Sequence, residues 1–171
     1  AKFLIVCPTS LVYNWESEFL KFAPEISYHV FAEQKEKRHE ALQSFEGNVY
    51  ITSYGLLRED LEMYQEKNFK VFVIDEAQNV KNPTAGITKA VKSIKSETKM
   101  ALTGTPIENS IVELWSIFDF IMPGFLSNLM KFQKKYKVKD FDEETNKLLE
   151  SLRMQVKPFI LRRKKNEVTK D

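Results

Sequence analysis

The chain contains few of the residues that build special sites. Cys7 is its only cysteine among 171 residues, which excludes an internal disulfide and a cysteine-based metal site. Only five glycines are present, and none begins the G-x-x-x-x-G-K-[ST] sequence of a phosphate-binding loop. No apolar run approaches the roughly 18 residues of a transmembrane helix. A reducing environment suits this composition, so we expect a cytoplasmic protein.

The overall composition is that of an ordinary globular domain, with 43% hydrophobic and 29% charged residues. The net charge of +2 does not by itself indicate a nucleic-acid-binding protein. Basic residues do gather between positions 131 and 139 and again at 162–165. A solvated surface and a contact with phosphate are both open interpretations of such short runs.

Strand-like and helix-like segments alternate along the first two thirds of the chain. The pattern predicts βαβ units and a mostly parallel α/β sheet, buried on both faces. After about residue 107 only helix-like segments follow. The strands are expected at 3–7, 28–31, 49–52, 71–74 and 100–102. The helices are expected at 11–22, 35–43, 55–65, 84–94, 113–122, 126–136 and 143–156.

The most informative segment is an apolar run that ends in two adjacent acids, Asp75 and Glu76. Open α/β sheets place their chemistry at the carboxyl ends of the strands. A carboxylate there is suited to hold Mg²⁺ through water, and a second acid can orient or deprotonate an attacking water. Acids that merely cap the next helix are the alternative.

Other strand ends carry small hydroxyl residues. Thr103 and Thr105 flank Gly104 after the last predicted strand, where they suit contact with a neighbouring loop or phosphate, or an ordinary turn. Two earlier strand ends, Pro8-Thr9-Ser10 and Thr52-Ser53-Tyr54, suit either backbone phosphates or plain helix capping. The polar loop 78–83 follows the acids directly, and Trp15 is expected to pack in the core.

The order of these segments closely resembles the first motor lobe of the SNF2 family of superfamily 2 helicase-like ATPases. The resemblance spans essentially the whole chain, and motifs II and III are its most specific parts. The matching segments are 4–11 with Asn14-Trp15 and Glu18-Phe19 (motif Ia), 51–54 (motif Ib), 73–83 (motif II), 101–109 with 113–116 and 123–126 (motif III and its extension), and 157–165 (the Pro-Phe-x-Leu-Arg-Arg signature).

The resemblance implies a partial RecA-like lobe at residues 1–110 and a helical protrusion at 111–171. It assigns Asp75 to Mg²⁺, Glu76 to the attacking water, and Thr103, Gly104 and Thr105 to coupling of the nucleotide and DNA sites. Gln78 stands in motif II where many members have histidine, which favours a bacterial or archaeal source. The DNA backbone is expected along Pro8, Thr9, Ser10, Thr52, Ser53, Tyr54, Lys81 and Asn82, with Arg162 and Arg163 at the far end of the protrusion.

The resemblance also implies parts that these residues do not include. The phosphate loop and the adenine-reading segment are expected before Ala1, and the second lobe with its arginine finger after Asp171. The parent protein would use ATP and Mg²⁺ to act on double-stranded DNA. The isolated piece would bind ATP and Mg²⁺ only weakly and would be inactive. Without the phosphate-loop strand, residues 99–102 would form an unpaired sheet edge, open to self-association.

Two other classes remain for comparison. A non-catalytic nucleic-acid-binding module would have lost the motor while keeping its groove, but such a module has no physical need for the acids Asp75 and Glu76. An unrelated flavodoxin-like or Rossmann domain would need a glycine-rich phosphate loop after a strand, and the sequence has none.

Overall fold

The computed structural model describes residues 1–104, 110–137 and 142–164. The chain divides into two compact units, Ala1–Leu129 and Met130–Asp171. The first unit contains the sheet and includes helix α6 (Ile111–Ile121), because α6 packs against the sheet core. The expected division of domains at residue 110 stays a prediction. No helix in the described parts is both long and apolar enough to cross a bilayer.

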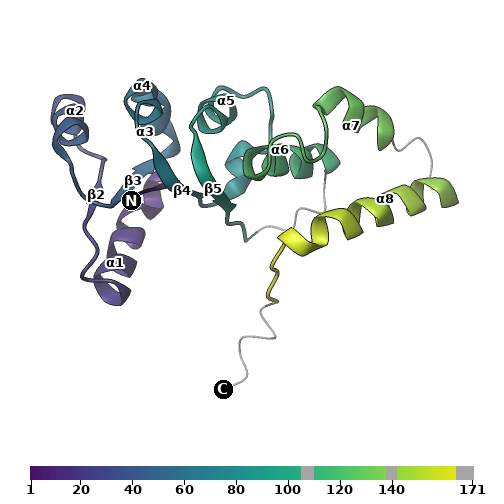
Figure 1. Cartoon of the computed structure of the whole chain (residues 1–171), viewed down its shortest axis with the longest axis horizontal. Coiled ribbons are helices and arrows are strands. Elements are labelled where there is room, and N and C mark those ends of the chain that lie inside the picture. The colour runs from purple at the N-terminus through teal and green to yellow at the C-terminus, as the bar shows by residue number, and fades with distance from the viewer. Residues whose placement is uncertain (105–109, 138–141, 165–171) are drawn as a thin grey trace, which may run out of the picture. The chain divides into compact units, whose positions relative to one another are not determined.

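The first unit is built on one parallel sheet of five strands in the order β2-β3-β1-β4-β5. This arrangement confirms the predicted α/β class, because parallel neighbours require helical crossovers. Figure 1 shows the strands with their connecting helices. The strands are β1 (Lys2–Cys7), β2 (Tyr28–Val30), β3 (Val49–Ser53), β4 (Phe69–Ile74) and β5 (Ser96–Ala101).

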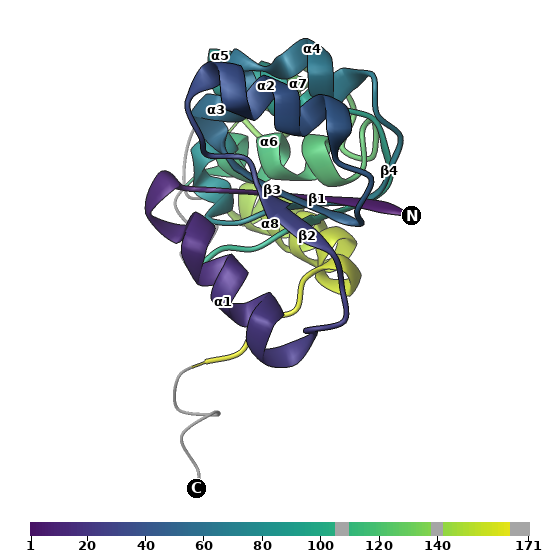
Figure 2. The same ribbon diagram turned by 90° about the vertical axis from the view of Figure 1, so that its left-hand side faces the viewer.

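Helices cover the two faces of the sheet unequally. Figures 1 and 2 show α1 on one face and α2, α3, α4 and α5 on the other. The helices of this unit are α1 (Val12–Phe22), α2 (Lys35–Ser44), α3 (Tyr54–Glu59), α4 (Leu61–Gln65), α5 (Gly86–Lys92) and α6 (Ile111–Ile121), with single 3₁₀ turns η1 (Thr9–Leu11) and η2 (Ala77–Val80).

Side chains of β1 point alternately to the two faces of the sheet, so this strand contributes to the core on both faces. Leu4 and Val6 belong to the larger core cluster, which includes side chains of α2 to α6, whereas Ile5 and Cys7 belong to the smaller cluster beneath α1. Successive side chains of a strand point to opposite faces, so a fully apolar strand can be buried on both. The smaller cluster places α1 beside the carboxyl ends of the central strands.

The second unit is helical. It contains α8 (Glu143–Val156), followed by η3 (Lys157–Phe159), and helix α7 (Leu129–Lys135) begins at the boundary. Asp142 caps α8 by accepting a hydrogen bond of 2.7 Å from the Thr145 backbone N–H. Leu152 and Val156 are the buried residues of α8.

The helix expected at 55–65 is two helices that meet at Asp60. Its carboxylate is fully buried and accepts hydrogen bonds from Arg38 Nε at 2.5 Å and Arg38 Nη2 at 3.1 Å. Its Oδ1 also lies 2.7 Å from His39 Nε2. An apolar periodicity does not detect such a tertiary ion pair, which explains why the break was not predicted.

The last strand starts earlier than residue 100 and has an open side. Among the described residues, β5 pairs with β4 alone, which confirms the predicted unpaired edge. The strand begins at Ser96 because backbone pairing with β4 does not require apolar side chains on an exposed edge. Met100 is 49% exposed and Leu102 is 37% exposed. Self-association through this edge stays a prediction.

Candidate functional site at the carboxyl end of the sheet

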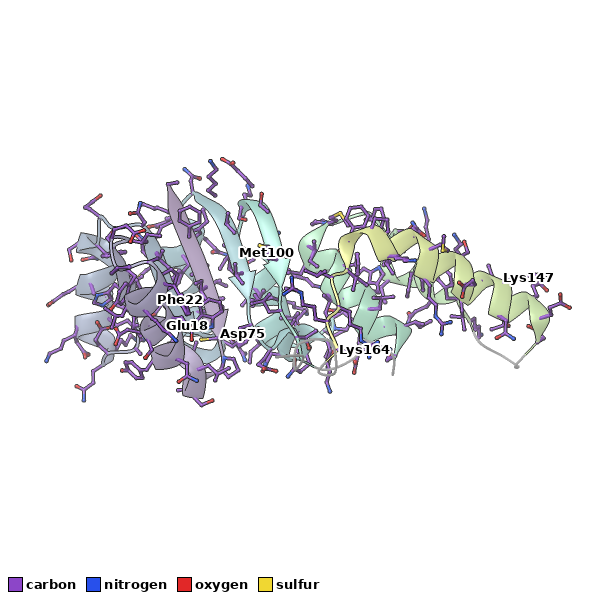
Figure 3. All side chains as sticks on the ribbon, turned by 90° about the horizontal axis from the view of Figure 1, so that it is seen from below. Glu18, Phe22, Asp75, Met100, Lys147 and Lys164 are labelled. Carbon is purple, nitrogen blue, oxygen red and sulfur yellow. The ribbon has the colours of Figure 1, made fainter. Side chains whose placement is uncertain are left out.

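Asp75 and Glu76 lie in a sharp turn at the carboxyl end of β4. The register continues for one residue beyond the strand, since the Asp75 backbone N–H donates to Val6 O at 2.8 Å. Glu76 then adopts φ 51° and ψ 58°, the left-handed region that non-glycine residues rarely occupy. Such conformations cost of the order of 1–3 kcal/mol and cluster at functional sites. Figure 3 labels Asp75 near the strand ends and Met100 on β5.

The Asp75 carboxylate is held by two neutral N–H groups. Its Oδ1 accepts from the Glu76 backbone N–H at 2.8 Å, and its Oδ2 accepts from the Trp15 indole Nε1 at 3.0 Å. The ion pairs among the described residues include neither Asp75 nor Glu76. The turn therefore carries negative charge that the described part of the protein leaves without a cation.

Side-chain hydrogen bonds join the acids to the end of β5. Gln78 Nε2 donates to Glu76 Oε2 at 2.6 Å, and Thr103 Oγ1 donates to Gln78 Oε1 at 3.1 Å. The backbone adds a further link, because the Ala77 N–H donates to Leu102 O at 2.8 Å. Segments separated by some 25 residues are thus brought together as predicted. Gly104 is exposed beside them, and Thr105 lies outside the described residues.

The end of β1 presents an exposed turn next to this site. Thr9 and Ser10 are exposed in η1, and Pro8 is half-buried. Cys7 is buried, and its thiol donates to Thr52 O at 3.8 Å. Burial, with the nearby negative charge of Asp75, raises the pKa of Cys7 to about 12, so it stays a neutral thiol.

The end of β3 differs, because its polar side chains face inward. Thr52 is fully buried and donates to Phe31 O at 3.1 Å, and Ser53 caps α3 by accepting from the Leu56 N–H at 3.3 Å. The Tyr54 hydroxyl donates to the Asp75 backbone carbonyl at 2.5 Å. Burial, reinforced by Asp75, raises the pKa of Tyr54 above its ordinary value of 10.0. These three side chains therefore have their polar contacts inside the protein.

Lys81 and Asn82, in the loop after the acids, are exposed and have polar partners within the protein. Lys81 Nζ lies 3.8 Å from Glu113 Oε1. Asn82 Oδ1 accepts from the Thr84 N–H at 3.1 Å and from its hydroxyl at 2.9 Å, which is a side-chain-stabilised turn. Arg162 and Arg163 are exposed in the second unit, which is described by itself.

Sequence reasoning missed two contributions to the site. Trp15 was expected only to pack, and it does pack against the cluster beneath α1, but its N–H also reaches Asp75. Tyr54 was expected at DNA, yet its hydroxyl supports the carbonyl of Asp75. Both residues stand near strand ends in the sequence, and this was the available signal that they lie near the site. The contacts themselves join Asp75 to residues 60 and 21 positions away, and such contacts leave no local pattern in the sequence.

The donor set fits one kind of metal site. No group of three or more histidine, cysteine or acidic side chains gathers among the described residues. This excludes a closed all-protein cage there but suits Mg²⁺, which keeps several waters and is bound through one or two carboxylates together with substrate phosphates. Asp75, fixed at both oxygens and without a cationic partner, fits that role.

Known proteins match the sequence of this chain over nearly its whole length. The family model described as the SNF2-related domain matches residues 1–171. An uncharacterized ATP-dependent helicase of Mycoplasma genitalium is 42% identical over 168 residues, covering 98% of this chain and 16% of the relative. The TATA-binding protein-associated factor MOT1 of Saccharomyces cerevisiae is 38% identical, covering 98% of this chain and 10% of the relative.

A solved structure gives the same result in three dimensions. The Sulfolobus solfataricus SWI2/SNF2 ATPase core in complex with dsDNA superimposes with a TM-score of 0.83 at 41% identity, covering 95% of this chain and 33% of that one. The relatives come from bacteria, archaea and eukaryotes, so they do not determine the source of this chain, and the source suggested by Gln78 stays a prediction. The chain spans only a small part of the curated relatives, and over its whole length it belongs to the SNF2-related domain family.

Proposed function

We propose that this chain is part of the first lobe of an ATP-dependent motor that moves on duplex DNA. The observation that carries the proposal is the hydrogen-bonded series Glu76–Gln78–Thr103, which lies beside Asp75 where β4 and β5 end. The dsDNA complex of the archaeal core and the helicase names of the relatives support the same assignment.

Asp75 would hold Mg²⁺ through water. The metal, when bound, would supply charge neutralisation at the β- and γ-phosphates of ATP. The protein's contribution is direction, because two N–H donors fix both oxygens of the Asp75 carboxylate in advance. A carboxylate that is already oriented pays less ordering entropy when its cation arrives.

Glu76 would orient the attacking water and accept its proton. Gln78 occupies one Glu76 oxygen, Oε2, and leaves the other for water. Thr103 in turn fixes the amide of Gln78, so that a shift of the segment after β5 changes the position of Glu76. Gly104 follows directly, and we extend the coupling role to Thr105 by the resemblance alone.

Contact with the DNA backbone is proposed for the exposed residues of the same rim. Thr9 and Ser10 are exposed, and Lys81 and Asn82 are exposed in the loop after the acids. The sequence predicts that the motif Ib side chains contact the DNA backbone, but we propose a different role for them because they are buried. Thr52, Ser53 and Tyr54 would shape the rim from inside while the backbone around them faces DNA.

The 171 residues alone should not turn over ATP. They contain no G-x-x-x-x-G-K-[ST] sequence, and phosphoryl transfer depends on the N–H cradle and lysine that such a loop supplies. We therefore expect phosphate release by the isolated chain to equal the background with and without duplex DNA. DNA-stimulated turnover by the isolated chain would contradict this.

The test of the motor assignment uses the longer protein in which we place this chain. Glu76→Gln keeps the size and a hydrogen-bonding oxygen but removes the base, so DNA-stimulated phosphate release should fall about a hundredfold or more. Glu62→Gln changes an exposed glutamate of α4 and serves as the matched control. Equal rates for the two variants, or no stimulation of the unaltered protein by duplex DNA, would refute the proposal.

A further inference from the structure

We infer that Trp15 is a positioning residue for the metal site, because its indole N–H sets the direction of the Asp75 carboxylate. The inference rests on the proposed function only for its consequence on Mg²⁺-dependent turnover. The contact itself joins α1 to the turn after β4 across 60 residues, at 3.0 Å between Nε1 and Oδ2.

The two bonds to the Asp75 carboxylate have different origins. The bond to Oδ1 comes from the next backbone N–H, so it moves together with the turn that carries Asp75. The bond to Oδ2 comes from a separate helix, α1, so it is the one that ties the carboxylate to an element outside its own turn. A hydrogen bond to an ionised acceptor is shorter and stronger than one between neutral groups.

The indole is itself held in place by packing. Trp15 is half-buried and lies against the cluster formed by the second face of β1 and β3. Its ring centroid is 6.4 Å from that of Phe19, which stacks in turn on Tyr28 at 6.0 Å. A ring that is packed against its neighbours can hold its N–H in one direction, as the outer partners of metal ligands do.

The described residues offer no charged substitute for this contact. The ion pairs among them omit Asp75. An arginine or lysine at the position of Trp15 would orient the carboxylate equally well but would also neutralise it. The indole orients Asp75 and leaves its full negative charge for a divalent cation.

The first experiment needs no turnover and uses the intact chain with ¹⁵N-labelled tryptophan. The chain has two tryptophans, and Trp115→Phe assigns the Trp15 indole resonance. We expect Asp75→Asn to shift the Trp15 indole signal and to leave that of Trp115, whose N–H donates to Ser127 O at 3.1 Å. Mn²⁺, added in excess because the isolated chain is expected to bind the metal weakly, should broaden the Trp15 signal selectively, and Asp75→Asn should remove the broadening. An unmoved Trp15 signal, or equal broadening of both, would overturn the inference.

The second experiment measures Mg²⁺ dependence in the longer protein. Trp15→Phe keeps an aromatic ring and removes the donor, so the Mg²⁺ concentration for half-maximal ATPase activity should rise about tenfold, the lower end of the range for partners of metal ligands. The KM for ATP at saturating Mg²⁺ should stay nearly unchanged. Trp115→Phe is the matched control, and the same Mg²⁺ dependence in both variants would overturn the inference.

The two arms separate this inference from the proposed function. If the longer protein shows no DNA-stimulated ATPase activity while the indole responds to Asp75→Asn and to Mn²⁺, the motor assignment fails and the positioning role stands. If turnover is normal and the indole does not respond, the positioning role fails alone. Circular dichroism of Trp15→Phe distinguishes loss of the contact from loss of the fold.

Discussion

Asp60 and Asp75 are two aspartates held in opposite ways. Asp60 is fully buried between α3 and α4 and is paired with Arg38 and His39. Asp75 is half-buried at the rim of the sheet and is held only by N–H groups that carry no charge. A buried carboxylate with cationic partners holds elements together, whereas an oriented carboxylate without one remains able to bind a cation. The difference separates a structural acid from a candidate catalytic one.

The largest expected effect on stability comes from removing the buried charge of Asp60. Asp60→Asn removes the buried counter-charge of the Arg38 guanidinium and leaves only Glu59, whose exposed carboxylate lies 3.3 Å from Arg38 Nη2. The loss should be about 3 kcal/mol of unfolding free energy, the lower end of the range for a broken buried ion pair. Asp75→Asn is the matched substitution, and it should cost less, about 1–2 kcal/mol, because it weakens two hydrogen bonds at the half-buried rim and leaves no buried cation without its partner. Urea unfolding followed by circular dichroism measures both. Similar losses for the two variants would remove the distinction drawn here.

The pH dependence of stability should sharpen the same comparison. Burial alone would raise the pKa of Asp60, but hydrogen bonds from Arg38 and His39 and their positive charges hold it below its ordinary value of 3.8. A lowered folded-state pKa stabilises the fold fully above that ordinary value and loses this contribution as the pH falls through the folded value.

The stability difference between the unaltered chain and Asp60→Asn should therefore shrink in acid, as the pH falls below the ordinary value of 3.8 and through the lowered pKa of Asp60. Urea midpoints measured from neutral pH downward provide the test. A difference that grows as the pH falls would show that the ion pair is not the source of the stability.

The smallest expected effect concerns Ser53 at the end of β3, where the polar side chains face inward. Ser53→Ala removes the cap of α3 and should cost about 1 kcal/mol, with DNA-stimulated ATPase activity of the longer protein retained. Ser44→Ala serves as the control, because the Ser44 hydroxyl is exposed and donates only to Glu40 O within α2. Loss of turnover in Ser53→Ala without loss of stability would assign Ser53 to the DNA or nucleotide site instead.

Much of the fold was predictable from local patterns. The apolar runs around Ile5, Ile51 and Val73 form neighbouring parallel strands, in register with one another. The open edge at β5 also followed from the sequence, through the family resemblance. The break at Asp60 and the packing of α6 on the sheet did not, because both depend on partners that are distant in sequence.

The candidate site was predictable in composition and only partly in arrangement. The adjacency of Asp75 and Glu76 after an apolar strand identified the rim, and the structure links that rim to Thr103 through Gln78. The inward orientation of Thr52, Ser53 and Tyr54 was not visible, because hydroxyl residues at a strand end suit both a cap and a ligand contact. The roles of these residues in turnover and DNA binding stay predictions.

The parallel α/β layer, the acidic turn after β4 and the family all follow from the amino-acid sequence, because burial patterns and motif order are local properties of a chain. Which polar groups face one another depends on how the elements pack in three dimensions. Trp15 meets Asp75, and Arg38 meets Asp60, through contacts between elements that the packing of helices on the sheet brings together. Their physical basis is hydrogen bonding to a buried carboxylate in Asp60 and to a half-buried one in Asp75, which no periodicity in the sequence encodes.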